Sequence, residues 1–134
     1  MYVSRILKSF RNIAIVGVSA NTDKPSYHVC EYLIEQGYNV IPVNPTIKEV
    51  LGKKCFATLS DIRERVDVVD IFRRSEDVIP IVDEAIAIGA KAVWMQEGVV
   101  NKTAAEKAET AGLLVVMDRC IKKEHMHLRE GDGE

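Results

Sequence analysis

Five short apolar runs, most of them rich in β-branched residues, alternate along the chain with stretches of helical periodicity. The runs cover residues 12–18, 38–43, 66–72, 91–95 and 113–117. They are largely continuous instead of alternating apolar with polar residues, which is typical of strands buried on both faces of a parallel sheet. Strand and helix in alternation predict an α/β domain with a five-stranded parallel sheet, helices on both faces and right-handed crossovers.

The segments between the runs carry the signals of helices. Pro25 suits the first position of a helix, and Gly37 supplies its C-terminal stop. The apolar spacing predicts further helices over 78–88 and 103–111. Shorter helices are predicted over 3–10 and 119–128.

The chain length predicts one domain. With 134 residues, the chain matches the size of a single compact unit and can form a core without disulfides or a structural metal. We expect one domain over 1–134, with an ordered core over about 5–128 and a frayed tail over 130–134.

Charge and cysteine content exclude several classes of protein. The formal net charge of −2 argues against nucleic-acid binding, which normally requires a basic excess. The longest apolar run, 113–117, is far shorter than the ~20 residues of a membrane span, and residues 1–10 lack the layout of a signal peptide. Three widely spaced cysteines do not form a disulfide framework, so we expect a cytoplasmic protein.

The turn after the first strand is the strongest candidate for ligand binding. Ligands of open α/β sheets bind at the carboxyl ends of the strands, and the turn from Gly17 to Pro25 lies there, just before a helix. Backbone N–H groups at a helix start attract phosphate, and small residues let it approach closely. We interpret this turn as a diphosphate clamp, with an ordinary strand-to-helix turn as the alternative.

This turn departs from the glycine pattern of dinucleotide-binding proteins. Ser19 and Thr22 occupy the positions of the second and third glycines of G-x-G-x-x-G. An NAD site also requires an acidic residue at the end of the second strand, but this strand ends at Asn44 and no carboxylate occurs before Glu49. The sequence therefore favours a diphosphate ligand other than NAD or FAD.

Arg73 and Arg74 directly follow the third strand, at the same edge of the sheet. Guanidinium groups present fork-shaped donors that match phosphate oxygens. A phosphate-binding pair and a solvated pair on a loop are both consistent with the sequence.

We interpret two aspartates and one histidine as residues of the fold and not of a catalytic site. Asp67 and Asp70 lie in the third strand with no His or Ser motif to partner them, so we predict hydrogen-bonded structural carboxylates instead of a general base. His28 lies near the start of a helix and is expected to be partly exposed.

The cysteine and histidines near the C-terminus give only weak chemical signals. Cys120, His125 and His127 have neither the spacing nor the fourth ligand of a zinc site, so we predict no metal. Arg119 next to Cys120 favours a thiolate, but no base or orienting partner is evident. We therefore predict no catalytic residue.

Several segments together resemble a known family. In chain order they are IVGVS (15–19), KPSY (24–27), GYNVIPVNP (37–45), GKKC (52–55), VWMQEG (93–98) and DRC (118–120). Over about residues 5–128 the chain resembles the small stand-alone CoA-binding proteins, which are similar to the amino-terminal domain of the succinyl-CoA synthetase alpha subunit. The PVNP element is the most specific part of the resemblance.

The resemblance implies a Rossmann-like three-layer domain with coenzyme A, or an acyl-CoA, extended across the strand ends. Ser19, Ala20 and Asn21 would hold the diphosphate. Asn44 and Pro45, with Lys48 in support, would border the 3′-phosphate. Phe72, Arg73 and Arg74 would flank the adenine or ribose side, and Gln96 and Glu97 would line the pantetheine path. Arg119 and Cys120 would lie at the rim of the pocket. The full set of implied binding residues is Gly17, Val18, Ser19, Ala20, Asn21, Lys24, Ser26, Asn44, Pro45, Lys48, Phe72, Arg73, Arg74, Gln96, Glu97 and Arg119.

Three functional hypotheses follow. The leading one is a non-catalytic CoA-binding protein that acts as a carrier, a sensor or a protector of thiols. The second is a detached CoA-binding subunit of an acyl-CoA ligase or transferase, whose protein partner supplies catalysis. The resemblance does not extend to the phosphohistidine domain of the synthetase, so ligase activity itself is not implied. The weakest hypothesis is an NAD(H)-binding redox sensor, and the oligomeric state stays open.

Overall fold

A computed structural model describes residues 2–132 of the chain. Its elements follow in the order α1 (Tyr2–Ser9), β1 (Asn12–Val16), α2 (Pro25–Glu35), β2 (Asn39–Val43), β3 (Glu49–Val50), β4 (Lys53–Lys54), η1 (Leu59–Asp61), β5 (Val68–Ile71), η2 (Ser75–Asp77), α3 (Val78–Ala87), β6 (Ala92–Met95), α4 (Lys102–Thr110), β7 (Leu114–Val116) and α5 (Ile121–Asp132).

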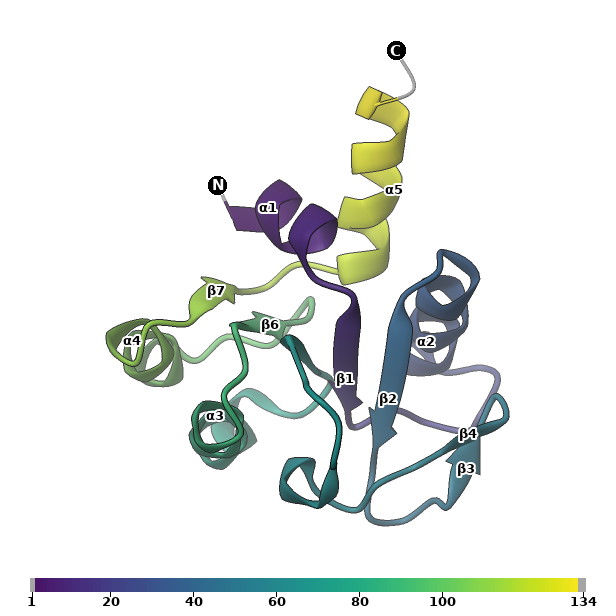
Figure 1. Cartoon of the computed structure of the whole chain (residues 1–134), viewed down its shortest axis with the longest axis horizontal. Coiled ribbons are helices and arrows are strands. Elements are labelled where there is room, and N and C mark those ends of the chain that lie inside the picture. The colour runs from purple at the N-terminus through teal and green to yellow at the C-terminus, as the bar shows by residue number, and fades with distance from the viewer. Residues whose placement is uncertain (1, 133–134) are drawn as a thin grey trace.

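The main sheet is five-stranded and parallel throughout, in the order β2-β1-β5-β6-β7. The strand order reverses next to β1, because the chain first adds β2 on one side and later β5, β6 and β7 on the other (Figure 1). This arrangement confirms the predicted Rossmann-like α/β fold. It also places a topological switch point at the carboxyl end of β1, where such sheets bind ligands.

Helices cover both faces of the sheet, and strand side chains alternate between the two layers. Ala14 and Val16 join the apolar cluster formed with α3 and α4, whereas Ile13 and Ile15 join the cluster formed with α1, α2 and α5. Trp94 is fully buried in the second cluster, as expected of a strand-four core residue. The two clusters are the cores of a three-layer sandwich.

Several element ends differ from the sequence prediction. β5 covers only 68–71 of the predicted 66–72, α1 covers 2–9, and α5 spans 121–132. The last helix therefore extends beyond its predicted end at Leu128. Of the tail expected to fray, 130–132 are helical in this structure, and 133–134 lie outside the described residues.

A small antiparallel hairpin, β3 with β4, was not predicted. In the sequence it lies between β2 and β5. Phe56, which follows it, forms a parallel bridge to Val43, so this segment runs along the outer edge of β2. Two-residue strands are too short to show a period, so the pattern of apolar residues does not predict them.

Within residues 2–132, no helix is both long and apolar enough to cross a membrane.

Candidate functional site

A cleft of about 620 Å³ opens where β1, β5 and β6, the three central strands, reach their carboxyl ends. Three segments form its walls: the turn after β1 with the start of α2, the residues after β5, and the turn after β6. The lining residues are Gly17, Ser19, Lys24, Pro25, Ser26, Phe72, Arg73, Arg74, Asp77, Gln96, Glu97, Gly98 and Val99.

Gly17 sets the distance between the first two walls. It has a φ of +89°, and a Cβ built on it would overlap the carbonyl oxygen of Phe72 and lie 2.9 Å from the Phe72 carbonyl carbon. The same Cβ position lies 3.3 Å from Cδ of Arg73. Because glycine has no side chain, the turn after β1 can lie directly against the residues that follow β5.

Side chains of the first turn bind part of its own backbone. Ser26 Oγ accepts a hydrogen bond from the Ser19 N–H at 2.9 Å, and Ser19 Oγ accepts one from the Asn21 N–H at 3.0 Å. Among residues 2–132, nothing accepts a hydrogen bond from the N–H groups of Ala20 and Thr22, and both residues are exposed. The turn is thus held in one shape while two donors stay available to an anion.

The two arginines after β5 have different surroundings. Arg74 is paired with acid, at 3.0 Å from Asp77 and 3.7 Å from Glu76, and the hydrogen bond to Asp77 raises the pKa of the Arg74 guanidinium. Arg73 forms no ion pair with any residue in 2–132. Arg73 is therefore the more available of the two cations for a phosphate.

The turn after β6 forms the third wall. Gln96 is buried, and its Oε1 accepts the Ile121 N–H at the start of α5 at 3.1 Å. Glu97 is an ion-pair partner of Lys123 at 2.9 Å, and this hydrogen bond raises the pKa of Lys123. Both side chains tie the cleft wall to the first turn of α5.

The structure does not bring every expected binding residue into the cleft. Asn44 instead supports the first turn, because its Nδ2 donates to the Val18 carbonyl at 2.8 Å. Arg119 lies 3.5 Å from Glu124 and lines a separate groove with Tyr2 and Met117. The expected residues outside the cleft lining are Val18, Ala20, Asn21, Asn44, Pro45, Lys48 and Arg119.

Sequence reasoning missed four lining residues: Pro25, Asp77, Gly98 and Val99. Pro25 closes the 17–25 turn interpreted from the sequence as a diphosphate clamp, and Gly98 and Val99 follow Gln96 and Glu97 in the turn after β6, so all three lie within strand-end segments that the sequence marked. Asp77, at the end of η2, lies just past the segment expected after β5, and local periodicity does not report that the chain returns to the cleft there.

The two aspartates near β5 differ from each other. Asp67 accepts the Asn12 N–H at 3.1 Å and pairs with Arg65 at 3.1 Å, which confirms the structural interpretation. For Asp70 the prediction of a hydrogen bond is wrong, since neither carboxylate oxygen has a partner in residues 2–132. Asp70 lies in register with Ile15 and Trp94, where both neighbouring strands use their backbone groups in the ladder. Burial raises its pKa well above the usual value.

The histidines and cysteines lie outside the cleft lining. His28 is exposed, as predicted, and His125 Nδ1 lies 2.6 Å from the Tyr32 hydroxyl. All three cysteines are free, and burial raises the pKa of Cys30 to about 12. In the described part of the chain, no group of three His, Cys, Asp or Glu side chains could hold a metal ion.

Sequence comparison assigns residues 11–126 to the "CoA binding domain" family. "Uncharacterized protein YneT" of Bacillus subtilis (strain 168) is 39% identical over 123 residues, covering 92% of this chain and 91% of that protein. "Acetate--CoA ligase [ADP-forming] II" of Archaeoglobus fulgidus is 28% identical over 60% of this chain, a match that spans only 12% of the ligase.

Solved structures show the same fold. A hypothetical protein from Pyrococcus horikoshii OT3 has a TM-score of 0.92 at 41% identity, covering 95% of this chain and 89% of that one. The dinucleotide-forming acetyl-coenzyme A synthetase 1 of Ca. Korarchaeum cryptofilum has a TM-score of 0.70 at 26% identity. That match covers 78% of this chain and 25% of the synthetase.

Proposed function

Because the chain belongs to the CoA-binding domain family, we propose that it binds coenzyme A or an acyl-CoA in the cleft at the carboxyl ends of β1, β5 and β6. It does so without catalysing a reaction, as a carrier, a sensor or a protector of the CoA thiol. The cytoplasm, with its free CoA pool and reduced thiols, is the compartment in which we expect it to act.

The gathering of phosphate donors at one end of the cleft carries this proposal. The N–H groups of Ala20 and Thr22, which have no acceptor in residues 2–132, belong to the turn that leads into α2, and Lys24 and Arg73 line the cleft beside it. Backbone donors at a helix start and a guanidinium are the groups that bind a diphosphate. The donor set therefore fits the central part of CoA.

The end of β2 favours CoA over NAD. Asn44 stands where an NAD site would have its acidic residue, and its side chain is engaged with the Val18 carbonyl. β2 lies beside β1, so a ligand held by its diphosphate at the first turn would extend toward Asn44, Pro45 and Lys48. A 3′-phosphate at this place would be accepted by lysine and repelled by a carboxylate.

The cleft chemistry supports binding without catalysis. Its lining includes no histidine or cysteine, and its two carboxylates are paired, Asp77 with Arg74 and Glu97 with Lys123. The Ser26 hydroxyl accepts the Ser19 N–H, and within residues 2–132 no base accepts a hydrogen bond from it. These groups can hold and orient a ligand.

The ligase relatives favour a second candidate. The chain corresponds to only 12% of an ADP-forming acetate–CoA ligase and 25% of an acetyl-coenzyme A synthetase chain. As a detached CoA-binding subunit, it would present bound CoA to a protein partner that carries the catalytic groups. Recovery from native lysate only as a free species would argue against this candidate.

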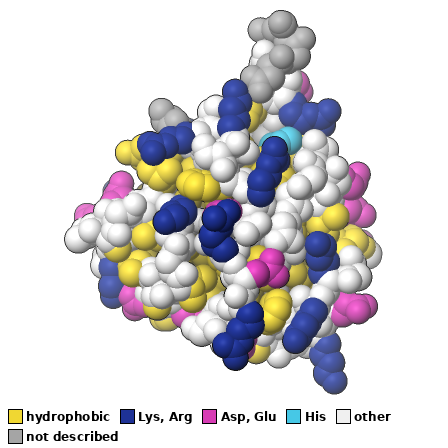
Figure 2. All heavy atoms as spheres, viewed as in Figure 1, with side chains coloured by type: hydrophobic (Ala, Val, Ile, Leu, Met, Phe, Trp, Pro, Cys, Tyr) yellow, Lys and Arg dark blue, Asp and Glu magenta, His cyan; other side chains and the backbone are white. Residues whose placement is uncertain are grey.

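Basic side chains are dispersed over the face shown in Figure 2, with uncharged and acidic atoms between them. A nucleic-acid partner usually meets a continuous basic stripe. With the net charge of −2, this distribution on one face favours a small-molecule ligand over a nucleic acid.

Native mass spectrometry of the purified full chain, supplied with CoA and NADH at equal concentration, tests the proposed function. We expect one CoA per chain and displacement of any NADH. Arg73→Ala should weaken CoA binding about tenfold, as for loss of a charge-assisted hydrogen bond. Arg63→Ala, which removes an exposed arginine between η1 and β5, is the matched control. A chain that binds NADH and stays bare with CoA would refute the proposal.

A further inference from the structure

The third wall of the cleft is a tight turn that contacts a residue twenty positions further along the chain. The Val99 N–H donates to the Gln96 carbonyl at 2.9 Å, and Gly98 between them has a φ of +84°. The turn from Gln96 to Val99 supplies four of the residues that line the cleft. The Gln96 N–H also donates to the Ile71 carbonyl at 3.3 Å, which ties the start of the turn to β5 but leaves its apex at Gly98 to other contacts.

Asp118 contacts this turn from outside the cleft. Its Oδ1 accepts the Gly98 N–H at 2.8 Å across twenty residues of sequence. Asp118 itself has a φ of +62°, in the left-handed region that residues other than glycine rarely adopt. An unfavourable backbone conformation held beside a binding cleft is a common sign that the side chain's position matters.

Residues next to Asp118 and next to the turn hold both of them in place. After Asp118, the Arg119 N–H donates to the Met95 carbonyl at 3.2 Å, and the Arg119 carbonyl accepts the Trp94 Nε1–H at 2.8 Å. On the other side of the turn, Ser75 Oγ accepts the Val100 N–H at 2.9 Å and donates to the Gly98 carbonyl at 3.4 Å. The Asp118 carboxylate is therefore held in place as the acceptor for the Gly98 N–H at the apex of the turn.

We propose that Asp118 is a positioning residue for ligand binding, because its carboxylate holds the Gly98 apex of the 96–99 turn, the wall for the pantetheine end of CoA. The inference rests on the proposed function. Asp118 does not line the cleft, so its effect on affinity is transmitted through the Gly98 backbone. The diphosphate end, formed by the turn after β1, does not depend on it.

Two substitutions separate the hydrogen bond from the backbone strain. Asp118→Gly removes the acceptor while making a positive φ favourable, so the fold is retained. Asp118→Asn keeps an oxygen acceptor and also tolerates a positive φ. We expect Asp118→Gly to weaken CoA binding by about threefold to tenfold, as for loss of one hydrogen bond, and Asp118→Asn to restore most of the affinity.

Titration calorimetry with CoA and with adenosine 3′,5′-bisphosphate, which lacks pantetheine, distinguishes positioning from a general loss of structure. Asp118→Gly should lower affinity for CoA and leave affinity for the bisphosphate unchanged. The Gly98 amide resonance should shift in the same variant, because its hydrogen bond is lost.

Equal CoA affinity in the wild type and Asp118→Gly would overturn the positioning role while leaving the proposed function intact. An equal loss for both ligands would also overturn it, since the whole cleft would then have changed. Failure of the wild type to bind CoA would instead refute the proposed function, and with it this inference.

Discussion

Gly17 lies so close to Phe72 that a Cβ on Gly17 would overlap the Phe72 carbonyl oxygen. The Phe72 N–H also donates to the Val16 carbonyl at 2.8 Å, so the β1 and β5 ladder continues to the point where the cleft opens. This contact joins the turn that presents backbone N–H groups to the segment that presents Arg73. The cleft therefore depends on a residue that contributes no side chain.

Gly17→Ala should destabilise the protein by about 3 kcal/mol or more and abolish CoA binding, because backbone atoms must separate to admit the Cβ. Denaturant unfolding and calorimetry measure the two effects. Gly37→Ala is the matched control, since Gly37 has a nearly equal φ of +91° but nothing within 4 Å of an added Cβ. The control should lose only about 1–2 kcal/mol, from the left-handed backbone alone. Similar losses in both variants would contradict the role given to the contact.

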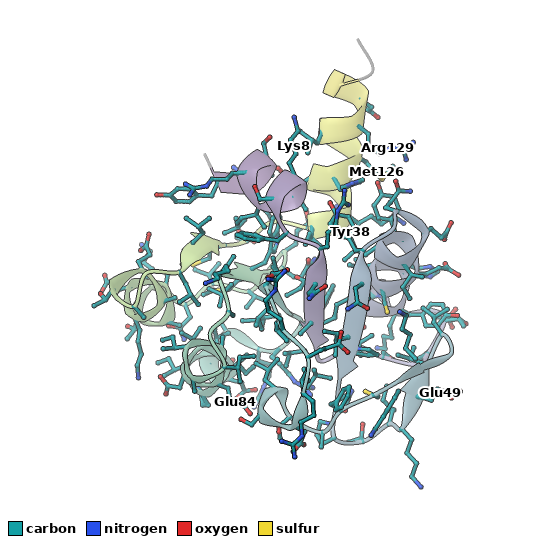
Figure 3. All side chains as sticks on the ribbon, viewed as in Figure 1. Lys8, Tyr38, Glu49, Glu84, Met126 and Arg129 are labelled. Carbon is teal, nitrogen blue, oxygen red and sulfur yellow. The ribbon has the colours of Figure 1, made fainter. Side chains whose placement is uncertain are left out.

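Ser26→Ala should cost about 1 kcal/mol of stability and lower CoA affinity, because the Ser19 N–H loses its acceptor and the first turn loosens. Denaturant unfolding and calorimetry again provide the readouts. Ser60→Ala is the control. The Ser60 hydroxyl donates to Glu84 Oε2 at 2.8 Å, and Glu84 lies on α3, where Figure 3 labels it. Neither Ser60 nor Glu84 lines the cleft. Its CoA affinity should equal that of the wild type. An unchanged affinity in Ser26→Ala would show that the turn does not need this bond.

The buried Asp70 should make stability fall as the pH rises. Burial raises the pKa of its carboxyl in the folded state, so the native chain keeps a proton that the unfolded chain releases. Its contribution is fully present below about pH 4 and is lost as the pH rises through the folded-state pKa, at up to about 1.4 kcal/mol per pH unit. Urea unfolding of the wild type and Asp70→Asn between about pH 4 and 7 should show this slope in their difference. A difference that is independent of pH would contradict it.

His125 should make the stability of the protein fall as the pH drops into the mildly acidic range, the opposite of the effect of Asp70. It lies between Tyr32 and Tyr38, which is labelled in Figure 3 near the base of α5, and burial, then Arg129 and Arg11, lower its pKa. The unfolded chain therefore binds a proton before the folded chain does, and stability falls as the pH drops below about 6.5.

His125→Gln should remove this acid-sensitive contribution in urea unfolding, while His28→Gln, at an exposed histidine, should leave it in place. Tyr32→Phe, which removes the hydroxyl 2.6 Å from His125 Nδ1, should cost about 0.5–1.5 kcal/mol at neutral pH. Identical pH profiles for the wild type and His125→Gln would contradict the assignment.

The sequence was informative wherever local pattern determines structure. Apolar runs such as 12–18 located the strands, and the rule that ligands bind at strand ends led directly to Ser19 and Arg73, both of which line the cleft. Local sequence patterns do not predict contacts between residues that are far apart in the chain. Asp118 and Gly98 meet across twenty residues, and nothing in the spacing of either segment reports that hydrogen bond.

Asp70 shows a second limit. A carboxylate in an apolar strand suggested a hydrogen-bond partner, because buried polar groups usually have one. Whether a partner is within reach depends on the neighbouring strands, and here Ile15 and Trp94 stand beside it in the sheet. Such pairings are fixed by strand order and register, which follow from the whole chain.

The central claim is that CoA binds in this cleft, and an amide chemical-shift titration of the full chain with CoA tests it most directly. The account predicts saturable shifts in the three walls, over residues 17–26, 72–77 and 96–99, and smaller changes at the amino ends of the strands, near Asn12 and Asn39. Shifts confined to other surfaces, or a cleft that responds to NADH and not to CoA, would contradict it.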